Sequence, residues 1–433
     1  MIPDYPCLLL RAKRLSLVSF LFFLPLLEAP KNISGVLYVM FTFLLATRYS
    51  NRFNFYLFKS GFVDKVLLLI ILSAILAGID GYFSIETFRS NINWALMPLV
   101  AYCVIRDSSI DSLPELKNCM KWIFFGAGFS YIDMLFTSDF IRGGFPELRS
   151  VGHVNQSALY ISLIAVLSLA STQVYQNLNS RLYLAFLILA SWMLLIAGRS
   201  MIAVTVAGCC SFLVAVYFFW IQSRLAKYIL AFPFVIVVSI YFAVSLSDNY
   251  KIQVDEFYAE VAVKIQSGDT MMSGRQRLLE STLYSMDGIW LFGSGIGNYD
   301  TSVTTEKVRS ELVNRNEEWG VNRARFQFQN HGHSLYITGL AERGIIGLAI
   351  IVILFCLIIF YFYRMFGRTT NIWLVLVYCA GVYAFLGGVG NTTLHNEHGQ
   401  LAFLIIAFSA CAVRYCYSNE RCLRRVSDVG SAD

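Results

Sequence analysis

The sequence predicts an all-α integral membrane protein with about twelve transmembrane helices and one large, ordered and mostly helical loop on the outer side. Hydrophobic residues make up 57% of the chain and charged residues only 14%, whereas soluble domains carry about 25% charged residues. Apolar runs of about 20 residues recur along the chain, and inside hydrocarbon such runs must be helical because their backbone groups find no water. One long polar segment, residues 247–332, interrupts this pattern.

The apolar runs set the expected spans. They are 15–29, 33–49, 64–81, 92–105, 119–136, 154–171, 181–197, 200–221, 228–246, 341–363, 371–389 and 398–416. An even number of spans puts both termini on the same side of the membrane.

Lysine and arginine in the short connections set the orientation. With the N-terminus inside, the short inner segments hold 19 of these residues and the short outer segments hold five. Because basic residues gather on the cytoplasmic side, both termini are predicted to be cytoplasmic. The net charge of +6 reflects this asymmetry and does not indicate a nucleic-acid partner. The first apolar run follows "RAKR" like a signal peptide, but Pro30 after Ala29 leaves no small-x-small cleavage site, so an uncleaved helix is predicted.

The segment 247–332 is predicted to be a large periplasmic loop between the ninth and tenth helices of a single membrane domain, 1–433. Loops this long are usually functional. It contains no cysteine, so its fold must rest on packing rather than on disulfides. The apolar spacing predicts one amphipathic helix over 248–265 and a second one capped by Ser273 and Gln276. The stretch "GIWLFGSGIGNYD" predicts tight turns, with a phosphate-binding nest as the weaker alternative.

Arg199, in "LLIAGRSMIAV", is predicted to lie at the outer membrane–water boundary, in the shortest outer connection. The head group of a lipid-linked pyrophosphate lies at the same depth, and a guanidinium offers it a planar pair of donors. The alternative is an arginine that anchors a helix end at the interface.

Arg275 and Arg277 are predicted in the first turn of the helix capped by Ser273. Arginine is disfavoured at a helix N-terminus unless an anion is close, so the pair indicates either an anion-binding corner or a solvated charged face. Residues two apart point to different sides of a helix, and Arg275 is favoured.

His333, in "NHGHSLYITGLAERGIIG", is predicted just outside the membrane at the start of the tenth helix, above Tyr336. Imidazole is the side chain whose reference pKa suits it to accept a proton near neutral pH. A base beside two arginines suggests attack by a hydroxyl on a carbon whose leaving group is a phosphate. His331 is expected to point elsewhere if the stretch is helical. A purely structural histidine is the alternative.

Metal chemistry finds little support in the sequence. Five histidines fall on the predicted outer side without an H-x-x-x-H pair, and "TTLHNEHG", with His395, Glu397 and His398, is the only local cluster. Asp80 and Glu86 are weak acidic candidates. No metal site is predicted.

Several of these residues resemble motifs of the bacterial O-antigen ligase and polymerase superfamily. Its pattern is a His, then Asn, Ser or Gln, then nine residues, then G-x-x-G; here it reads His333, Ser334, nine residues, Gly344 and Gly347. The segments "SGRQRLLESTLYSM", "LFGSGIGNY", "GRS", "EAPKNIS" and "GHVNQSALY" are similar to segments of that family, although the family often has Ser before the arginine of "GRS".

The resemblance implies a membrane glycosyltransferase of the bacterial inner membrane with a periplasmic active site. It would transfer a glycan from an undecaprenyl-pyrophosphate-linked O-antigen donor to lipid A–core, among membrane lipids and without metal or other cofactor. Arg199 and Arg275 would bind the pyrophosphate and His333 would activate the acceptor hydroxyl. Further candidates for substrate binding are Arg277, Arg323, Arg325, Tyr336, His331 and Asn155.

Other functions remain open from the sequence. An O-antigen polymerase would join lipid-linked repeat units instead, and "KNI" at 31–33 favours the ligase. A protein O-oligosaccharyltransferase is a third relative. A transporter would explain twelve helices but predicts charged or broken helices at the bilayer midplane. A scaffold would tolerate changes at Arg199, Arg275 and His333.

Overall fold

The described part of the chain is all-helical. The computed structural model describes residues 5–53, 62–80, 84–110, 112–137, 147–149, 154–175, 177–198, 200–220, 271–366, 372–394 and 396–429, and no strand occurs within these ranges. The predicted fold class is therefore confirmed at the level of an all-α protein. The expected ninth span at 228–246 and the expected amphipathic helix at 248–265 lie outside the described residues.

Helices follow one another with short connections. The longer ones are α1 (Tyr5–Phe23), α2 (Glu28–Phe53), α3 (Phe62–Ile75), α4 (Ile85–Arg106), α5 (Leu113–Thr137), α6 (Val154–Ser171), α7 (Leu178–Ala197), α8 (Met201–Trp220), α11 (Met271–Ser285), α15 (Leu335–Phe366), α16 (Ile372–Gly390) and α17 (Asn396–Val429). The shorter ones are η1 (Ser108–Ile110), α12 (Tyr299–Ser302), α13 (Thr305–Asn314), α14 (Trp319–Asn322) and η3 (Arg323–Arg325).

Several helices have the length and composition of membrane spans. Within the described ranges, four helices are long and apolar enough to cross a membrane: Glu28–Arg48, Leu178–Ile196, Leu335–Ile358 and Glu397–Tyr415. Three further apolar helices are shorter: Asn155–Ser171, Ile202–Tyr217 and Val375–Gly390. These helices make the chain a membrane protein. The total of twelve spans, the boundaries of the large loop and the orientation in the membrane stay predictions.

Two of the expected spans end six residues earlier than predicted. The expected helix at 15–29 ends at Phe23, because the chain turns at "LPLL" and α2 begins at Glu28, with Pro30 in its first turn. Proline is well suited to that position, since its missing N–H would have no helical partner there. The expected helix at 64–81 ends at Ile75 and is followed by a turn in which Gly78 has a φ of 80°.

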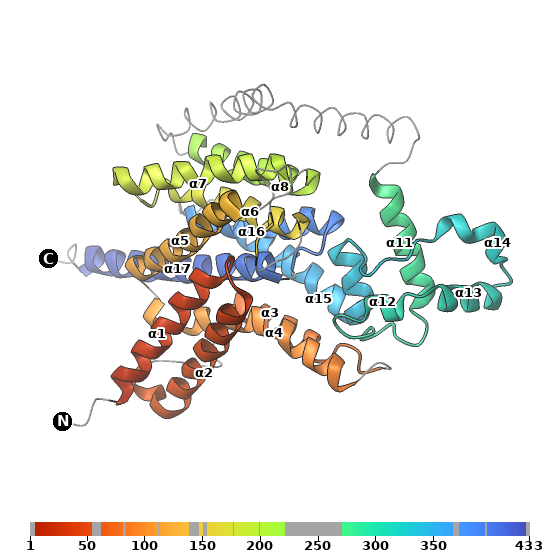
Figure 1. The fold of residues 1–433 in the computed structure, drawn as a ribbon. Helices are drawn as coiled ribbons and strands as arrows, with labels where there is room; N and C mark the ends of the chain where they lie inside the picture. The colour runs from red at the N-terminus through yellow and green to blue at the C-terminus, as the bar shows by residue number, and fades with distance from the viewer. Residues whose placement is uncertain are drawn as a thin grey trace, which may run out of the picture.

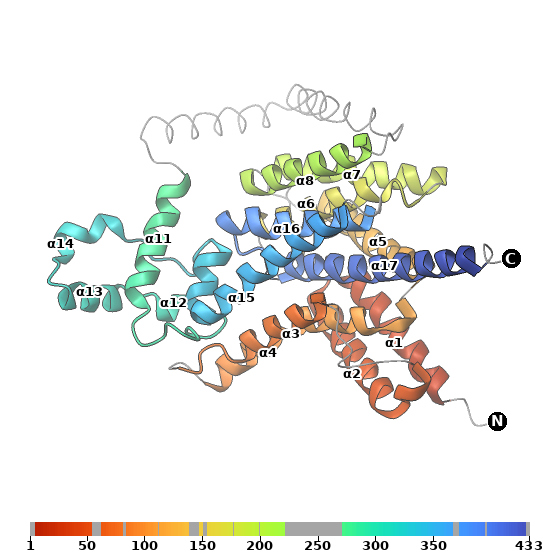
Figure 2. The same ribbon diagram turned by 180° about the vertical axis from the view of Figure 1, so that it is seen from behind.

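The helices pack around α17 and α6. In Figures 1 and 2, α17 runs through the middle of the molecule, and it packs against α4, α6 and α16. Side chains 157–171 of α6 are buried throughout, which fits a helix that is apolar on all sides. Pairs of consecutive helices, α1 with α2, α3 with α4 and α6 with α7, lie against each other as hairpins.

The helices α11 to α14 form a group at the end of the molecule opposite the C-terminus (Figures 1 and 2). A small core of Tyr284, Val308, Leu312 and Phe326 joins α11 and α13 to the segment after η3, while Tyr299 of α12 packs in a separate core with Leu278 and Leu340. The rings of Trp319 and Phe326 stack at 5.9 Å with an angle of 9°. In the described part of this segment, packing of apolar and aromatic side chains thus does the work that disulfides do in other small domains.

This group is joined to the membrane helices at a break in α15. Gly344 has a φ of 65° and a ψ of −169° inside the helix, so the helical bonds from the N–H groups of residues 345 and 346 to the carbonyls of residues 341 and 342 cannot form. The glycine-rich turn at 290–297 replaces them. Its four substitute bonds are Ser294 N–H to Ala341 O (2.8 Å), Gly295 N–H to Glu342 O (2.8 Å), Ile345 N–H to Trp290 O (2.8 Å) and Ile346 N–H to Leu291 O (3.3 Å).

The glycines make this close approach possible. A Cβ atom on Gly344 would overlap the backbone of Leu291, and one on Gly293 would lie 2.5 Å from the backbone nitrogen of Arg343. Further N–H groups of the turn are also used within the chain, from Ile296 to the Asn91 side chain at 2.9 Å and from Gly297 to the Glu342 carboxylate at 3.0 Å. The turn is therefore a docking element, and these contacts favour the structural interpretation of the glycine-rich stretch over the phosphate nest.

Replacing Gly344 with alanine should destabilise the protein by about 2 kcal/mol or more, because alanine at positive φ costs about 1–2 kcal/mol and its Cβ adds a backbone overlap. Thermal unfolding of the purified protein in detergent measures this. The matched control is Gly208→Ala in α8, where a Cβ meets no atom within 4 Å and alanine should be neutral or stabilising. Equal melting temperatures for the two variants would contradict the proposed role of the break.

Candidate active site

Three elements that carry predicted site residues meet at the C-terminal end of α16. Arg275 of α11 donates from Nη2 to the carbonyl of Gly390 at 2.9 Å. Ser334, directly after His333, donates its hydroxyl to the carbonyl of Gly388 at 2.9 Å. The N–H group of Leu335 donates to the carbonyl of Asn391 at 3.0 Å. The last carbonyls of a helix have no helical partner and carry partial negative charge, so they hold the arginine and the start of α15 in one corner.

His333 lies in a tight turn before α15 rather than in a helix. Its φ is 46°, one of two positive values among the non-glycine residues that the structure describes. α15 begins only at Leu335. The expectation that His331 points away depended on a helical stretch and is wrong, since the two imidazole rings lie 4.0 Å apart at an angle of 44°. A left-handed non-glycine residue costs free energy and is often found at functional sites.

Arg275 is half-buried on α11, whereas Arg277 is exposed. This difference agrees with the prediction that the two side chains point to different sides. Burial lowers the pKa of Arg275 from its usual value, because a charged group loses favourable interactions with water. The expected N-cap at Ser273 is wrong: α11 includes Met271 and Met272, so Ser273 lies inside the helix and both arginines lie beyond its first turn.

The start of α8 also reaches this corner. A Cβ atom on Gly390 would overlap the Ile202 side chain and lie 3.0 Å from Nη2 of Arg275. Ile202 comes three residues after Arg199, which itself lies outside the described residues. Asn155 is exposed at the start of α6. Roles for Arg199 and Asn155 remain predictions.

The other expected binding residues have packing or charge partners of their own. Tyr336 donates its hydroxyl to the carbonyl of Phe385 at 3.0 Å and packs edge-on against Phe355 and Phe385. Arg325 forms ion pairs with Glu280 at 3.1 Å and Glu317 at 3.3 Å. The hydrogen bond from Arg325 to Glu280 raises the pKa of this arginine. These contacts brace the helices α11 to α14; a role for exposed Arg323 or for Arg325 in binding a substrate stays a prediction.

Two charged residues next to the break in α15 have no counterpart among the sequence predictions. Arg343 is 2% exposed, and its guanidinium carbon lies 3.5 Å from the centroid of the Trp94 ring. Glu342 is also buried and accepts the N–H group of Gly297. An arginine over a tryptophan face gains a cation–π attraction that increases when water is excluded. In the sequence, the dipeptide "ER" inside an apolar run could have indicated these two buried charges.

The candidate metal cluster near 395–398 is not assembled by the residues that the structure describes. Glu397 forms a buried ion pair with Lys31 of α2, and Nε2 of His398 hydrogen-bonds with the carbonyl of Thr392 at 3.0 Å. His395 lies outside the described residues. Over the described ranges, no group of three or more His, Cys, Asp or Glu side chains is close enough to hold a metal ion.

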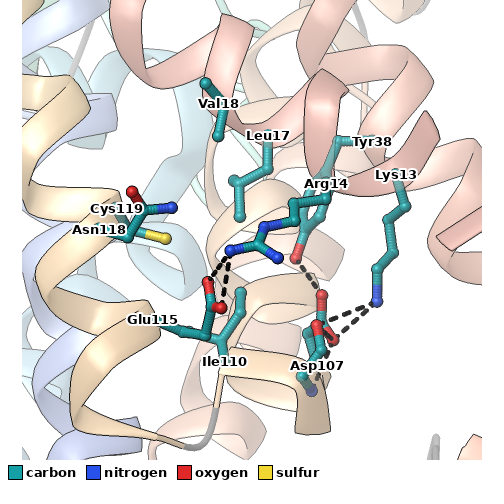
Figure 3. A pocket seen from close by; sticks show the side chains of 11 residues that line it. Lys13, Arg14, Leu17, Val18, Tyr38, Asp107, Ile110, Glu115, Asn118 and Cys119 are labelled. Atoms are coloured by element: carbon teal, nitrogen blue, oxygen red, sulfur yellow. Dashed lines mark hydrogen bonds and ion pairs between the residues drawn. The ribbon is translucent and has the colours of Figure 1, made fainter. Parts of the chain in front are cut away.

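A second polar cluster lies at the other end of the helices, where α1 meets α4 and α5 (Figure 3). It surrounds a small pocket of about 90 Å³. Lys13 donates to the buried carboxylate of Asp107 at 2.7 Å, and Arg14 binds Glu115 through two contacts of 2.7 and 2.8 Å. The hydroxyl of Tyr38 donates to Asp107 at 3.2 Å. Since these charges neutralise one another, the cluster joins helices rather than binding an ion.

The fold and the corner together define a class: an all-helical membrane protein in which a peripheral group of helices docks on the membrane helices. The candidate arginine and the residue after the candidate histidine both bond to the end of α16. Residues 184–352 match the sequence model of a family described as O-antigen ligase. This segment includes α11, the glycine-rich turn and the start of α15, and the match makes the chain consistent with a member of the O-antigen ligase/polymerase superfamily. No curated protein matches the chain.

The backbone at His333 gives a test of local strain. His333→Gly should be more stable than His333→Ala by about 1 kcal/mol, since glycine adopts positive φ without steric cost. Chemical or thermal unfolding in detergent compares the two variants. At exposed Gln276 inside α11 the order should reverse, because glycine is less favourable than alanine in a helix by about 1 kcal/mol. The same order at both positions would rule out the left-handed turn.

The cluster of Figure 3 gives a second stability test. Lys13→Met should cost about 3–5 kcal/mol because it leaves the Asp107 carboxylate buried without its cation. Arg14→Met, which breaks the more exposed neighbouring pair with Glu115, should cost about 0–1 kcal/mol. Unfolding of both variants in the same detergent measures the difference, and equal losses would show that burial does not distinguish the two pairs.

Proposed function

We propose that the protein is an O-antigen ligase that transfers a glycan from undecaprenyl pyrophosphate to lipid A–core at the outer face of the inner membrane. The observation that carries the proposal is the convergence of Arg275 and the His333–Ser334 turn on the last carbonyls of α16, two residues apart at Gly388 and Gly390. The family match over residues 184–352 supports the general reaction class. The choice of ligase over polymerase rests on the family description and on "KNI" at 31–33.

In the proposed reaction a hydroxyl oxygen of the acceptor attacks the anomeric carbon of the donor glycan. The new C–O bond forms as the bond from that carbon to the pyrophosphate oxygen breaks, and the hydroxyl proton moves to the imidazole of His333. A positioned base of this kind contributes about 10²–10⁴-fold to a rate. Single displacement inverts the anomeric centre.

The leaving group determines what the arginines must do. As the pyrophosphate departs, negative charge grows on its oxygen atoms, and donors fixed in advance stabilise that charge without reorganisation. Arg275 suits this role because its Nη2 is anchored on Gly390, which limits the freedom of the guanidinium. Arg199 would supply the second cation at the membrane boundary. Both lipids are confined to one leaflet, which increases the chance that they meet in line.

The proposal predicts that His333→Ala lowers the rate of transfer at least about 10²-fold while the protein still folds. Arg275→Lys keeps a charge and a donor for Gly390 but loses the planar fork, and about a 10²-fold loss is expected. The matched control is Arg309→Ala, an exposed arginine of α13, which should retain the wild-type rate.

The assay combines purified protein in detergent with lipid-linked O-antigen and lipid A–core, and a gel separates the products. A lipid A conjugate that depends on His333 is the expected result. Longer lipid-linked chains would instead identify a polymerase. A normal rate for His333→Ala, in protein with wild-type thermal stability, would remove the proposed base.

A further inference from the structure

A further polar site lies in a groove between α2, α4 and the start of α17. The groove has a volume of about 720 Å³. Its polar lining includes Glu28, Lys31, Asn93, Glu397 and Gln400. We propose that this groove binds uncharged sugar residues of the glycolipid acceptor, with Asn93 and Gln400 as specificity-determining contacts. The inference rests on the proposed function and adds the place of the acceptor.

Gln400 is the strongest indication of a ligand. The residue is 6% exposed, it lines the groove, and its Oε1 atom has no hydrogen-bond partner within the described structure. A buried carbonyl oxygen without a donor is costly and is usually paired. Rotation of the terminal amide about its last side-chain bond turns this oxygen toward the groove, where a hydroxyl group supplies such a donor and can also accept from a neighbouring amide. Asn93 lines the same groove one helix away and is exposed.

The charges of the groove select against a phosphate. Lys31 is the cation among the described lining residues, and it is already paired with the buried carboxylate of Glu397. Glu28 adds a second carboxylate to the lining. An anionic group would meet one neutralised cation and an excess of negative charge, whereas sugar hydroxyls hydrogen-bond to both carboxylates and amides. The pyrophosphate therefore belongs to the Arg275 corner and the sugars to the groove.

The apolar side of the groove suits the lipid portion of a glycolipid. Ile33 and Val36 of α2 line it and are 61% and 51% exposed. Leu96 and Met97 of α4 lie one turn further along the helix than Asn93. Polar contacts and apolar contacts about one turn apart on the same helices form an amphiphilic surface, as a sugar head group on a hydrocarbon chain requires.

The segment 391–394 links the groove to the corner. The indole N–H of Trp94, which lines the groove, donates to the carbonyl of Leu394 at 3.1 Å, and the carbonyl of Asn391 accepts from Leu335. Arg343, next to the break in α15, covers the Trp94 ring. The groove and the turn that carries His333 are therefore connected through directly bonded residues.

Binding of two glycolipids tests the proposal without turnover. Labelled lipid A–core and lipid A without core sugars are titrated onto the full-length protein in nanodiscs. Wild-type protein should bind the form with core sugars at least about tenfold more tightly, and Gln400→Leu and Asn93→Leu should each lose most of that difference. Affinity for lipid A without the sugars should not change. Asn118→Leu, in the pocket at the opposite end, is the matched control and should bind as wild type does.

A stability measurement separates binding from folding. Gln400→Leu removes a buried unpaired oxygen at similar volume, so it should unfold at the wild-type temperature or above it. A purely structural glutamine would instead lose stability on substitution. Asn93→Leu changes an exposed side chain and keeps the test informative if Gln400→Leu fails to fold.

Three results would overturn the inference. These are equal wild-type affinity for the two glycolipids, unchanged sugar preference in both variants, or a raised KM for the lipid-linked donor in place of the acceptor. Failure of the ligase proposal has a different signature, namely absence of any joined product in the transfer assay while the sugar-dependent binding persists.

Discussion

The arrangement of the whole site depends on how the backbone groups that lose their helical partners at the break in α15 are paired. Within an apolar environment each N–H and C=O group must find a partner, and at Gly344 two helical bonds are missing. The glycine-rich turn supplies four bonds in their place. That docking attaches the segment after α11 to α15, and α11 itself is held to the end of α16 by the bond from Arg275 to Gly390.

The candidate catalytic corner is built from helix ends. The last carbonyls of α16 carry partial negative charge, and they accept hydrogen bonds from Arg275 and Ser334. The chain then turns through His333 in a left-handed conformation before α15 starts. Rigid elements thus hold the arginine and the histidine, while the side chains that would meet a substrate lie at their tips, an arrangement that favours preorganised donors.

Charged residues buried among the helices are used in pairs. Lys31 binds Glu397 between α2 and α17, Lys13 binds Asp107 between α1 and the end of α4, and Arg343 lies over Trp94. Because an isolated buried charge is unstable, each pair also fixes which helices are neighbours. The groove beside Lys31 is left with amides, carboxylates and a hydroxyl as its polar groups, and this composition separates it chemically from the corner that holds Arg275.

The sequence by itself determined the helical membrane class, the positions of most helices and the candidates His333 and Arg275, because apolar runs and a spaced His…G-x-x-G pattern are local signals. Only the tertiary structure decided which backbone groups these residues meet. The close approach of the His331 and His333 rings depends on one non-helical dihedral angle. The docking function of the glycine-rich turn and the burial of Arg343 on Trp94 join residues far apart in the chain. Periodicity records which face of a helix is buried, but it does not record which partner covers that face.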